Sequence, residues 1–340
     1  MKCLFLPVLM ILCVSTSSAA KPAPEELTFS SGEFELTGDL RIPRGTPPFP
    51  VVIFVHGDGP NDRTSGGTYT PIMRCMNEAG FATFAWDKPG TGASSGELVT
   101  GRLQAQRAQI VLDAIELLKG HPDIDPGRIG LWGISQAGYV MPRVIMASGD
   151  VAFMIAVSCP GEPGVEQGAY LITAQAVCMG LSEEDRGDVE RLLSEAGRAQ
   201  TWAEYASIKS CLTEYPEAMA LSEYGINMGV RPEEEWERDD PEGEYFWDPM
   251  TAIRQTDIPI LAFFGERDTQ ADPLQGMEAY SAAIEDNPLS QAVLIPGGDH
   301  NLIVCETGSL LERSQRNHRD WKDYVPLYLK TLAVWLEELP

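Results

Sequence analysis

One serine lies in the kind of turn that could expose it as a nucleophile. Ser135 belongs to the segment 133–138, Gly-Ile-Ser-Gln-Ala-Gly, which follows the apolar run 128–133 and precedes the helix-compatible residues 139–147. A sharp turn from a strand into a helix holds a serine in a strained conformation, and small residues beside it leave room for neighbouring chains. The helix expected after Ser135 would direct N–H groups toward negative charge at the hydroxyl. The pattern predicts a strand-to-helix elbow with a nucleophilic serine.

A serine hydroxyl needs a base to take its proton, and the best-placed histidine is His300. It follows the apolar run 292–295 through a short Pro-Gly-Gly-Asp loop, which would carry it to the edge of the sheet where Ser135 lies. The chain has four histidines, and we expect the other three to shape loops or face solvent: His56, His121 and His318. We therefore assign the base to His300.

The acid that would orient His300 is expected just past the apolar run 258–264. Three carboxylates follow that run: Glu266, Asp268 and Asp272. We favour Asp268, because a turn through Gly265 lets the third residue after it point back across the edge of the sheet. Glu266 and Asp272 remain the alternatives.

Acyl transfer through a serine also needs two backbone donors for the tetrahedral oxyanion. One is expected to be the amide of Gln136, the residue after the nucleophile. The second is expected in the loop 56–60, whose glycines permit a close backbone approach. We assign it to Asp58, with Gly57 as the runner-up, and the alternative is an ordinary Gly-Pro turn.

These residues must be positioned by a sheet, and the sequence predicts one. Six short apolar runs have the pattern of strands buried on both faces of a parallel sheet: residues 51–56, 81–86, 128–133, 151–158, 258–264 and 292–295. Helical spacing separates them, as in residues 103–118 and 324–336. Residues 27–42 alternate as two antiparallel strands would. We therefore predict an α/β fold with a mostly parallel, doubly wound sheet.

Residues 161–250 interrupt this alternation. They contain no strand-like run, and their 21 acidic and 6 basic residues give a net charge of −15. Residues 181–198 and 201–212 have the pattern of amphipathic helices, and residues 231–245 are expected to be an exposed loop or a short helix. We predict an acidic helical cap at 161–250, inserted into a core made of residues 21–160 and 251–340. Its acidity would favour cationic or neutral substrates.

The first twenty residues have the pattern of a signal peptide. Lys2 precedes the apolar run 3–14, and small residues lead to Ala20, after which we expect cleavage. A membrane-spanning helix needs about 20 apolar residues, so no stable membrane insertion is expected once the signal is removed. The mature protein is predicted to be periplasmic or secreted.

Charge and cysteine content limit the partners further. The formal net charge of the whole chain is −25, so phosphate backbones would be repelled and nucleic acid is a poor candidate partner. Outside the predicted signal peptide there are five cysteines, with no spacing typical of a metal site: Cys75, Cys159, Cys178, Cys211 and Cys305. Cys178 and Cys211 could form a disulfide in an exported protein, and the alternative is that the cysteines are small buried hydrophobes.

Two further motifs carry a resemblance to a known family. Residues 56–63, His-Gly-Asp-Gly-Pro-Asn-Asp-Arg, resemble the His-Gly-Ser-Gly-Pro-x-Asp-Arg segment of bacterial carboxylesterases. Residues 87–94, Asp-Lys-Pro-Gly-Thr-Gly-Ala-Ser, are similar to the Asp-x-x-Gly-x-Gly-x-Ser loop of the same superfamily. With the chain order Ser, Asp, His, the sequence looks like an α/β-hydrolase from about residue 27 onward, apart from the cap. Exported carboxylesterases, serine aminopeptidases and dienelactone hydrolases are among the relatives implied.

The sequence departs from the family pattern at two positions. Ala137 stands where glycine is commoner. Asp58 replaces a neutral residue beside the expected oxyanion, where its charge would be unfavourable unless the side chain turns away, for example toward Arg63.

The resemblance and the residues together predict a serine hydrolase that cleaves carboxylic esters, with small or short acyl groups and an acyl-enzyme intermediate. Neither a cofactor nor a metal is expected. The runner-up is a serine peptidase or aminopeptidase acting on short peptides. A non-catalytic ligand-binding protein of the same fold is the third hypothesis, although such proteins usually lack a member of the triad, and none is missing here.

Overall fold

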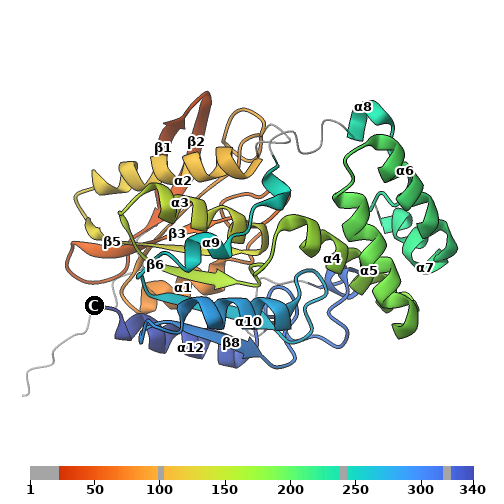
Figure 1. Cartoon of the computed structure of the whole chain (residues 1–340). Helices are drawn as coiled ribbons and strands as arrows, with labels where there is room; N and C mark the ends of the chain where they lie inside the picture. Colours follow the sequence, from red (N-terminus) through yellow and green to blue (C-terminus); the bar gives the residue numbers. More distant parts are fainter. Residues whose placement is uncertain (1–22, 99–102, 225, 237–242, 317–322) are drawn as a thin grey trace, which may run out of the picture.

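The architecture is an α/β sheet with helices on both faces, as a computed structural model of residues 23–98, 103–224, 226–236, 243–316 and 323–340 describes it (Figure 1). Within these residues, eight strands form one sheet in the order β1-β2-β4-β3-β5-β6-β7-β8. The strands are β1 (Glu25–Ser31), β2 (Phe34–Arg41), β3 (Phe49–Val55), β4 (Ala82–Trp86), β5 (Ile124–Ile134), β6 (Val151–Val157), β7 (Ile260–Gly265) and β8 (Gln291–Ile295).

The strands pair as the sequence predicts. β1 and β2 form an antiparallel hairpin and β2 pairs antiparallel with β4, whereas all pairs from β4 to β8 are parallel. β3, β4 and β7 are buried at every residue, which explains their continuous apolar sequence. The predicted α/β-hydrolase fold class is therefore confirmed. The carboxyl ends of β3 to β8 point the same way, so the loops that follow them meet at one edge.

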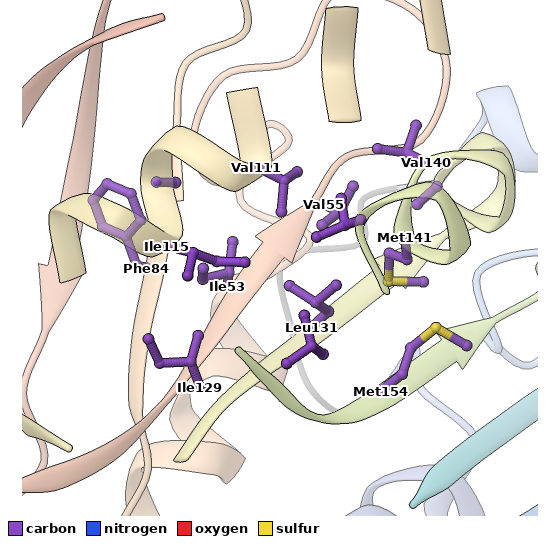
Figure 2. Packing of buried hydrophobic residues seen from close by; sticks show 14 of the residues in the cluster. Ile53, Val55, Phe84, Val111, Ile115, Ile129, Leu131, Val140, Met141 and Met154 are labelled. Atoms are coloured by element: carbon purple, nitrogen blue, oxygen red, sulfur yellow. The ribbon is translucent and has the colours of Figure 1, made fainter. Parts of the chain in front are cut away.

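Two layers of helices cover the sheet. One face packs against α2 (Leu103–Lys119), α3 (Met141–Ala147), α9 (Met250–Ile253) and α10 (Pro273–Ile284), and the other against α1 (Thr70–Glu78) and α12 (Pro326–Glu338). Figure 2 shows the first face, where Val111 and Ile115 of α2 lie over Ile53 and Val55 of β3. Alternate residues of β3 thus serve opposite cores, because side chains alternate across a strand.

The segment between β6 and β7 is helical, and its described residues form no strand. It contains α4 (Gly164–Cys178), α5 (Glu183–Gly197), α6 (Trp202–Cys211), α7 (Pro216–Met219), α8 (Glu233–Trp236) and three 3₁₀ turns, η2 (Leu212–Glu214), η3 (Ala220–Tyr224) and η4 (Glu244–Phe246). In Figure 1, α5 to α8 lie to one side of the sheet. These helices have an apolar cluster of their own, which includes Val189, Leu193 and Leu212. Helix α4 is absent from the sequence-based expectations, and it proves important for the site.

The cysteines confirm one of the two expectations only in part. Cys178 and Cys211 are free and exposed, so the possible disulfide between them is not formed and neither is a buried hydrophobe. Cys159 and Cys305 are free and buried, as the alternative hypothesis holds. The predicted signal peptide, residues 1–20, lies outside the described residues. None of the described helices has the length and apolar character that crossing a membrane requires.

Candidate active site

Ser135 lies at the tip of a tight turn after β5. Its backbone φ is 58°, a left-handed conformation that non-glycine residues rarely adopt and that is associated with functional sites. A Cβ atom on Gly133 would lie 2.6 Å from the Cβ of Ala137, and one on Gly138 would lie 2.7 Å from the Cβ of Cys159. The elbow therefore requires glycine at both of these positions, and Ala137 is accommodated because residue 133 has no side chain.

The element after the serine differs from the expected helix. Residues Ser135–Tyr139 form a 3₁₀ turn, η1, and the α-helix α3 begins only at Met141. Pro142 lies in the first turn of α3, where a proline is well tolerated. The backbone N–H of Gln136 still lies at the start of a helical element, next to the candidate nucleophile Ser135.

Asp268 and His300 form a buried hydrogen-bonded pair. The distance between His300 Nδ1 and Asp268 Oδ2 is 2.8 Å, and each residue is only 3% exposed. The other carboxylate oxygen, Oδ1, accepts hydrogen bonds from the backbone N–H groups of Gln270 and Ala271. A carboxylate with these partners makes Nδ1 the donor, which leaves the Nε2 lone pair of a neutral imidazole available as a base.

The two alternative acids have other partners. Asp272 is the N-cap of α10 and accepts hydrogen bonds from the N–H groups of Leu274 and Gln275. Glu266 accepts a hydrogen bond from the N–H of Gly297, in the loop that leads to His300. Both carboxylates therefore organise the surroundings, whereas Asp268 contacts the imidazole.

The loop that carries His300 lies directly over the end of β7. A Cβ atom on Gly265 would collide with the carbonyl oxygens of Gly298 and Asp299, so only glycine permits this approach. β7 is two positions from β5 in the sheet, and neighbouring strands are about 4.8 Å apart. The ends of β5 and β7 are therefore about 10 Å apart, and the side chains of Ser135 and His300 extend from these two positions.

The loop after β3 lies against the elbow, as predicted. A Cβ atom on Gly57 would be 3.2 Å from the carbonyl oxygen of Ile134 and 3.5 Å from the Cβ of Ser135. The side chains of Gln136 and Asp58 are also joined, since Gln136 Nε2 donates to Asp58 Oδ1 over 3.1 Å. The structure therefore brings Ser135, Gln136, Gly57 and Asp58 together.

Two buried cations support this loop, and sequence reasoning did not find them. Lys88 Nζ donates to the carbonyls of Gly57 and Gly59, at 3.0 and 2.7 Å. Arg107 donates to the His56 carbonyl and to the Gln136 side chain. Burial, with the nearby positive charge of Arg107, lowers the pKa of Lys88 to about 7.

The sequence does contain signals for both cations. Lys88 is the second residue after the strand β4, and Arg107 lies on the apolar face of helix α2, three residues before Ile110. A charged side chain on the buried face of an amphipathic helix is exceptional, because it must find partners inside the protein.

The Asp58 side chain is hydrogen-bonded to Gln136, and Arg63, the example given for its partner, does not contact it. Arg63 instead pairs with Asp87 at 2.9 Å, with Asp39 at 2.6 Å and with Glu26 at 3.0 Å. Asp87 also accepts a hydrogen bond from the N–H of Ala93. The ion pair between Arg63 and Asp87 thus joins the two family motifs and holds both loops at the edge of the sheet.

The remaining histidines lie away from the pair, where the structure describes them. His56 is buried, and its Nε2–H donates to the Trp86 carbonyl at 2.6 Å. His121 lies near Glu25, with 3.3 Å between Nε2 and Oε2. His318 lies outside the described residues. No group of three or more His, Cys, Asp or Glu side chains in the described chain could hold a metal ion.

Helix α4 contacts the backbone of the loop that carries the acid. The Tyr170 hydroxyl donates to the carbonyl of Asp268 at 2.8 Å, and Gln175 Nε2 donates to the carbonyl of Thr269 at 3.0 Å. Gln167 Nε2 donates to the next carbonyl, that of Gln270. Three side chains of one helix therefore hold three successive peptide units, and the helical segment is coupled directly to the acid.

The family follows from a comparison with known proteins. Residues 52–307 match the model of the alpha/beta hydrolase family. The chain belongs to the alpha/beta hydrolase family. The resemblance recognised in the sequence is thus confirmed, and the matched residues include every candidate named for the triad and the oxyanion site.

Two curated proteins match the chain over part of its length. Esterase EstD of Thermotoga maritima is 26% identical over 244 residues, which are 69% of this chain and 50% of EstD. An uncharacterized 31.7 kDa protein of Escherichia coli is 35% identical over 104 residues, 29% of this chain and 33% of that protein. The chain thus matches between a third and a half of the length of these curated relatives.

Solved structures have the same fold at low sequence identity. The Pyrococcus furiosus esterase Pf2001 has a TM-score of 0.56 and 15% identity, covering 93% of this chain and 91% of that one. A structure described as DcsB in complex with its substrate analogue has a TM-score of 0.55 and 16% identity, covering 93% and 99%.

The burial of His56 predicts how stability depends on pH. Burial, helped by the charges of Lys88 and Arg107, lowers its pKa from 6.5 to about 3. Between these values the unfolded chain binds a proton that the folded chain does not. The free energy of unfolding must therefore fall as pH decreases through that window, by about 5 kcal/mol in total.

Urea denaturation at pH 7.5 and pH 4.5 measures this effect in the wild type and in His56→Asn. We expect the free energy of unfolding of the wild type to fall by about 3 kcal/mol more than that of the variant between the two pH values. Equal pH dependence in the two proteins would show that His56 protonates in the folded state.

Proposed function

We propose that this protein is a serine hydrolase that cleaves carboxylic esters through Ser135, His300 and Asp268. The buried hydrogen bond between His300 and Asp268, at the sheet edge where the strained Ser135 lies, is the observation that carries the proposal. A serine becomes a useful nucleophile only beside an oriented base. The backbone strain at residue 135 has a ready explanation if the hydroxyl must face the substrate.

In the acylation step, Ser135 Oγ attacks the ester carbonyl carbon while its proton passes to His300 Nε2. The carbon–oxygen double bond becomes a single bond, and the oxygen takes the negative charge. When the tetrahedral intermediate collapses, the bond to the alcohol oxygen breaks and the alcohol leaves with the proton from His300. Asp268 stabilises the imidazolium that exists between these events, and it is already desolvated and hydrogen-bonded for that role.

Deacylation repeats the same transfers with water. His300 Nε2 removes a proton as the water oxygen attacks the acyl carbon, and Ser135 leaves with that proton. One ester and one water give one acid and one alcohol, so neither a redox partner nor a cofactor is required by this sequence of steps.

The oxyanion is expected to face the amides of Gln136 and Asp58, with Gly57 as the alternative second donor. The Asp58 carboxylate accepts a hydrogen bond from the Gln136 side chain, which directs it along the surface of the loop. Lys88 and Arg107 lie beneath the same loop. Their positive charges offset that of Asp58, so an acidic residue here is compatible with an oxyanion site.

An ester substrate is supported by the names of the relatives. EstD and Pf2001 are both described as esterases. In this proposal residues 161–250 form a cap over the site, and the hydrogen bonds from α4 to the Asp268 loop support that role. Small or short acyl groups are the expected substrates, and export to the periplasm or medium remains part of the proposal.

The first test compares p-nitrophenyl esters from acetyl to dodecanoyl with aminoacyl p-nitroanilides. We expect turnover of the short esters, and a loss of about 10³-fold or more in kcat in Ser135→Ala, because that variant lacks the nucleophile. Ser210→Ala, on the exposed surface of α6, is the matched control and should retain wild-type activity.

Three results would contradict the proposal. Ester turnover that survives in Ser135→Ala would place the nucleophile elsewhere. Turnover of the anilides with no activity on any ester would identify the protein as a peptidase. No turnover of either series would favour a ligand-binding protein.

Lys88 is proposed to position the oxyanion loop. In Lys88→Met, the carbonyls of Gly57 and Gly59 lose their donor, so the loop should shift while the substrate still binds. We expect kcat for p-nitrophenyl acetate to fall by about 10- to 100-fold with little change in KM. Lys330→Met, at an exposed position of α12, is the control. An unchanged kcat in folded Lys88→Met would exclude this role.

A further inference from the structure

A cavity of about 720 Å³ lies among the helices between β6 and β7. It is lined by α4, α5, α6 and the turn η4, on a face of α4 other than the one that contacts the acid loop. Its volume lies within the range of about 300 to 1,000 Å³ that is typical of small-molecule sites. No step of the proposed hydrolysis makes use of this cavity.

Lys209 brings a positive charge to the wall of the cavity. It is the only lysine of residues 161–250, it lies on α6, and it is 6% exposed. In the part of the chain that the structure describes, its ammonium has no hydrogen-bond acceptor and no carboxylate partner. Its charged neighbour is Arg231, which also lines the cavity, and burial together with this like charge lowers the pKa of Lys209 to about 8.

Three arginines of this segment are arranged differently from Lys209. Arg186, Arg191 and Arg198 lie toward solvent, and each pairs with a carboxylate. The segment has a net charge of −15, yet none of its described carboxylates pairs with Lys209. A buried charge without a partner is costly, so this arrangement is expected where an incoming anion supplies the partner.

The rest of the wall is largely apolar. Val165 and Ile172 of α4 and Leu193 of α5 contribute aliphatic surface, and Tyr245 and Phe246 of η4 contribute aromatic rings. Tyr205 lies on α6 with Lys209, and its ring packs against Trp236, with 5.8 Å between the ring centroids. A ligand that fits this lining would have an apolar body and one anionic end.

We propose that this cavity binds an organic carboxylate with an apolar body, and that Lys209 holds the carboxylate. The acidity of the surrounding segment suggested cationic or neutral ligands, but the charges that line the cavity have the opposite sign. The single ammonium of Lys209 matches a singly charged head group. This inference goes beyond ester hydrolysis and does not depend on it, because the site is defined without Ser135.

Direct binding of octanoate tests the proposal, with octanamide as its neutral counterpart. Binding is measured by calorimetry and by the fluorescence of Trp236, which lines the cavity. We expect octanoate to bind the wild-type protein at least tenfold more tightly than octanamide. Equal affinities, or no binding of octanoate, would overturn the proposal.

Lys209→Met assigns the carboxylate contact. We expect it to weaken octanoate at least tenfold and to leave octanamide unchanged, while Lys330→Met on α12 changes neither. The melting temperature should stay equal or rise, because a buried charge without a partner is replaced by an apolar side chain. Wild-type affinity for octanoate in Lys209→Met would contradict the proposal.

Gly168→Phe tests the cavity by volume. Gly168 lines the cavity, and a Cβ atom there would meet nothing within 4 Å, so the new side chain can occupy the open space without a clash. We expect both octanoate and octanamide to lose binding in this variant. Retained binding of both would place the ligand elsewhere.

A final experiment distinguishes binding in this cavity from binding in the proposed catalytic site. Octanoate is also the product acid of an octanoyl ester, so it could occupy the acyl position beside Ser135. Protein whose Ser135 carries a covalent phosphonate should bind octanoate with unchanged affinity. Loss of binding after phosphonylation would overturn the inference while leaving the proposed hydrolase intact.

Discussion

The site depends on one interaction, the hydrogen bond between the buried carboxylate of Asp268 and Nδ1 of His300. A carboxylate that is 3% exposed is stable only when its oxygens have donors. Two backbone N–H groups and the imidazole provide them, so the loop after β7 and the loop after β8 must fold together. Gly265 permits this contact, because any side chain there would meet the backbone of the His300 loop. The same hydrogen bond fixes the tautomer that an acid–base catalyst needs.

The proposed oxyanion loop is held by buried charges as well as by packing. Lys88 and Arg107 are buried cations whose hydrogen bonds go to carbonyls of the loop 56–59. In a trans peptide the N–H points opposite to the C=O. When Lys88 and Arg107 hold the carbonyls of this loop, its N–H groups therefore point away from these two cations. Asp58 is acceptable in this setting because positive charge lies beneath it. Burial of His56 behind the loop completes a rigid support for the elbow.

Much of this architecture could be predicted from the sequence, because buried parallel strands have a distinctive apolar pattern. All six predicted runs are strands, and the apolar face of residues 103–118 is the buried face of α2. The elbow was also predictable, because the close contacts around the serine require small residues on both sides of it, and these are visible in the sequence. Partners of long polar side chains were not: Arg63 joins Asp87 rather than Asp58, and Lys88 and Arg107 reach across the fold. The contacts of helix α4 with the Asp268 loop could not be predicted, because they join residues nearly 100 positions apart in the sequence.

The rate at which a fluorophosphonate ester labels the protein tests the central claim most directly, with the modified peptide identified by mass spectrometry. The account predicts a single adduct, on Ser135, because the His300 base activates this hydroxyl alone. It also predicts that His300→Gln slows labelling by about 100-fold or more while the fold is retained. An adduct on another residue, or an equal rate in His300→Gln, would contradict the claim that the Asp268–His300 pair activates Ser135.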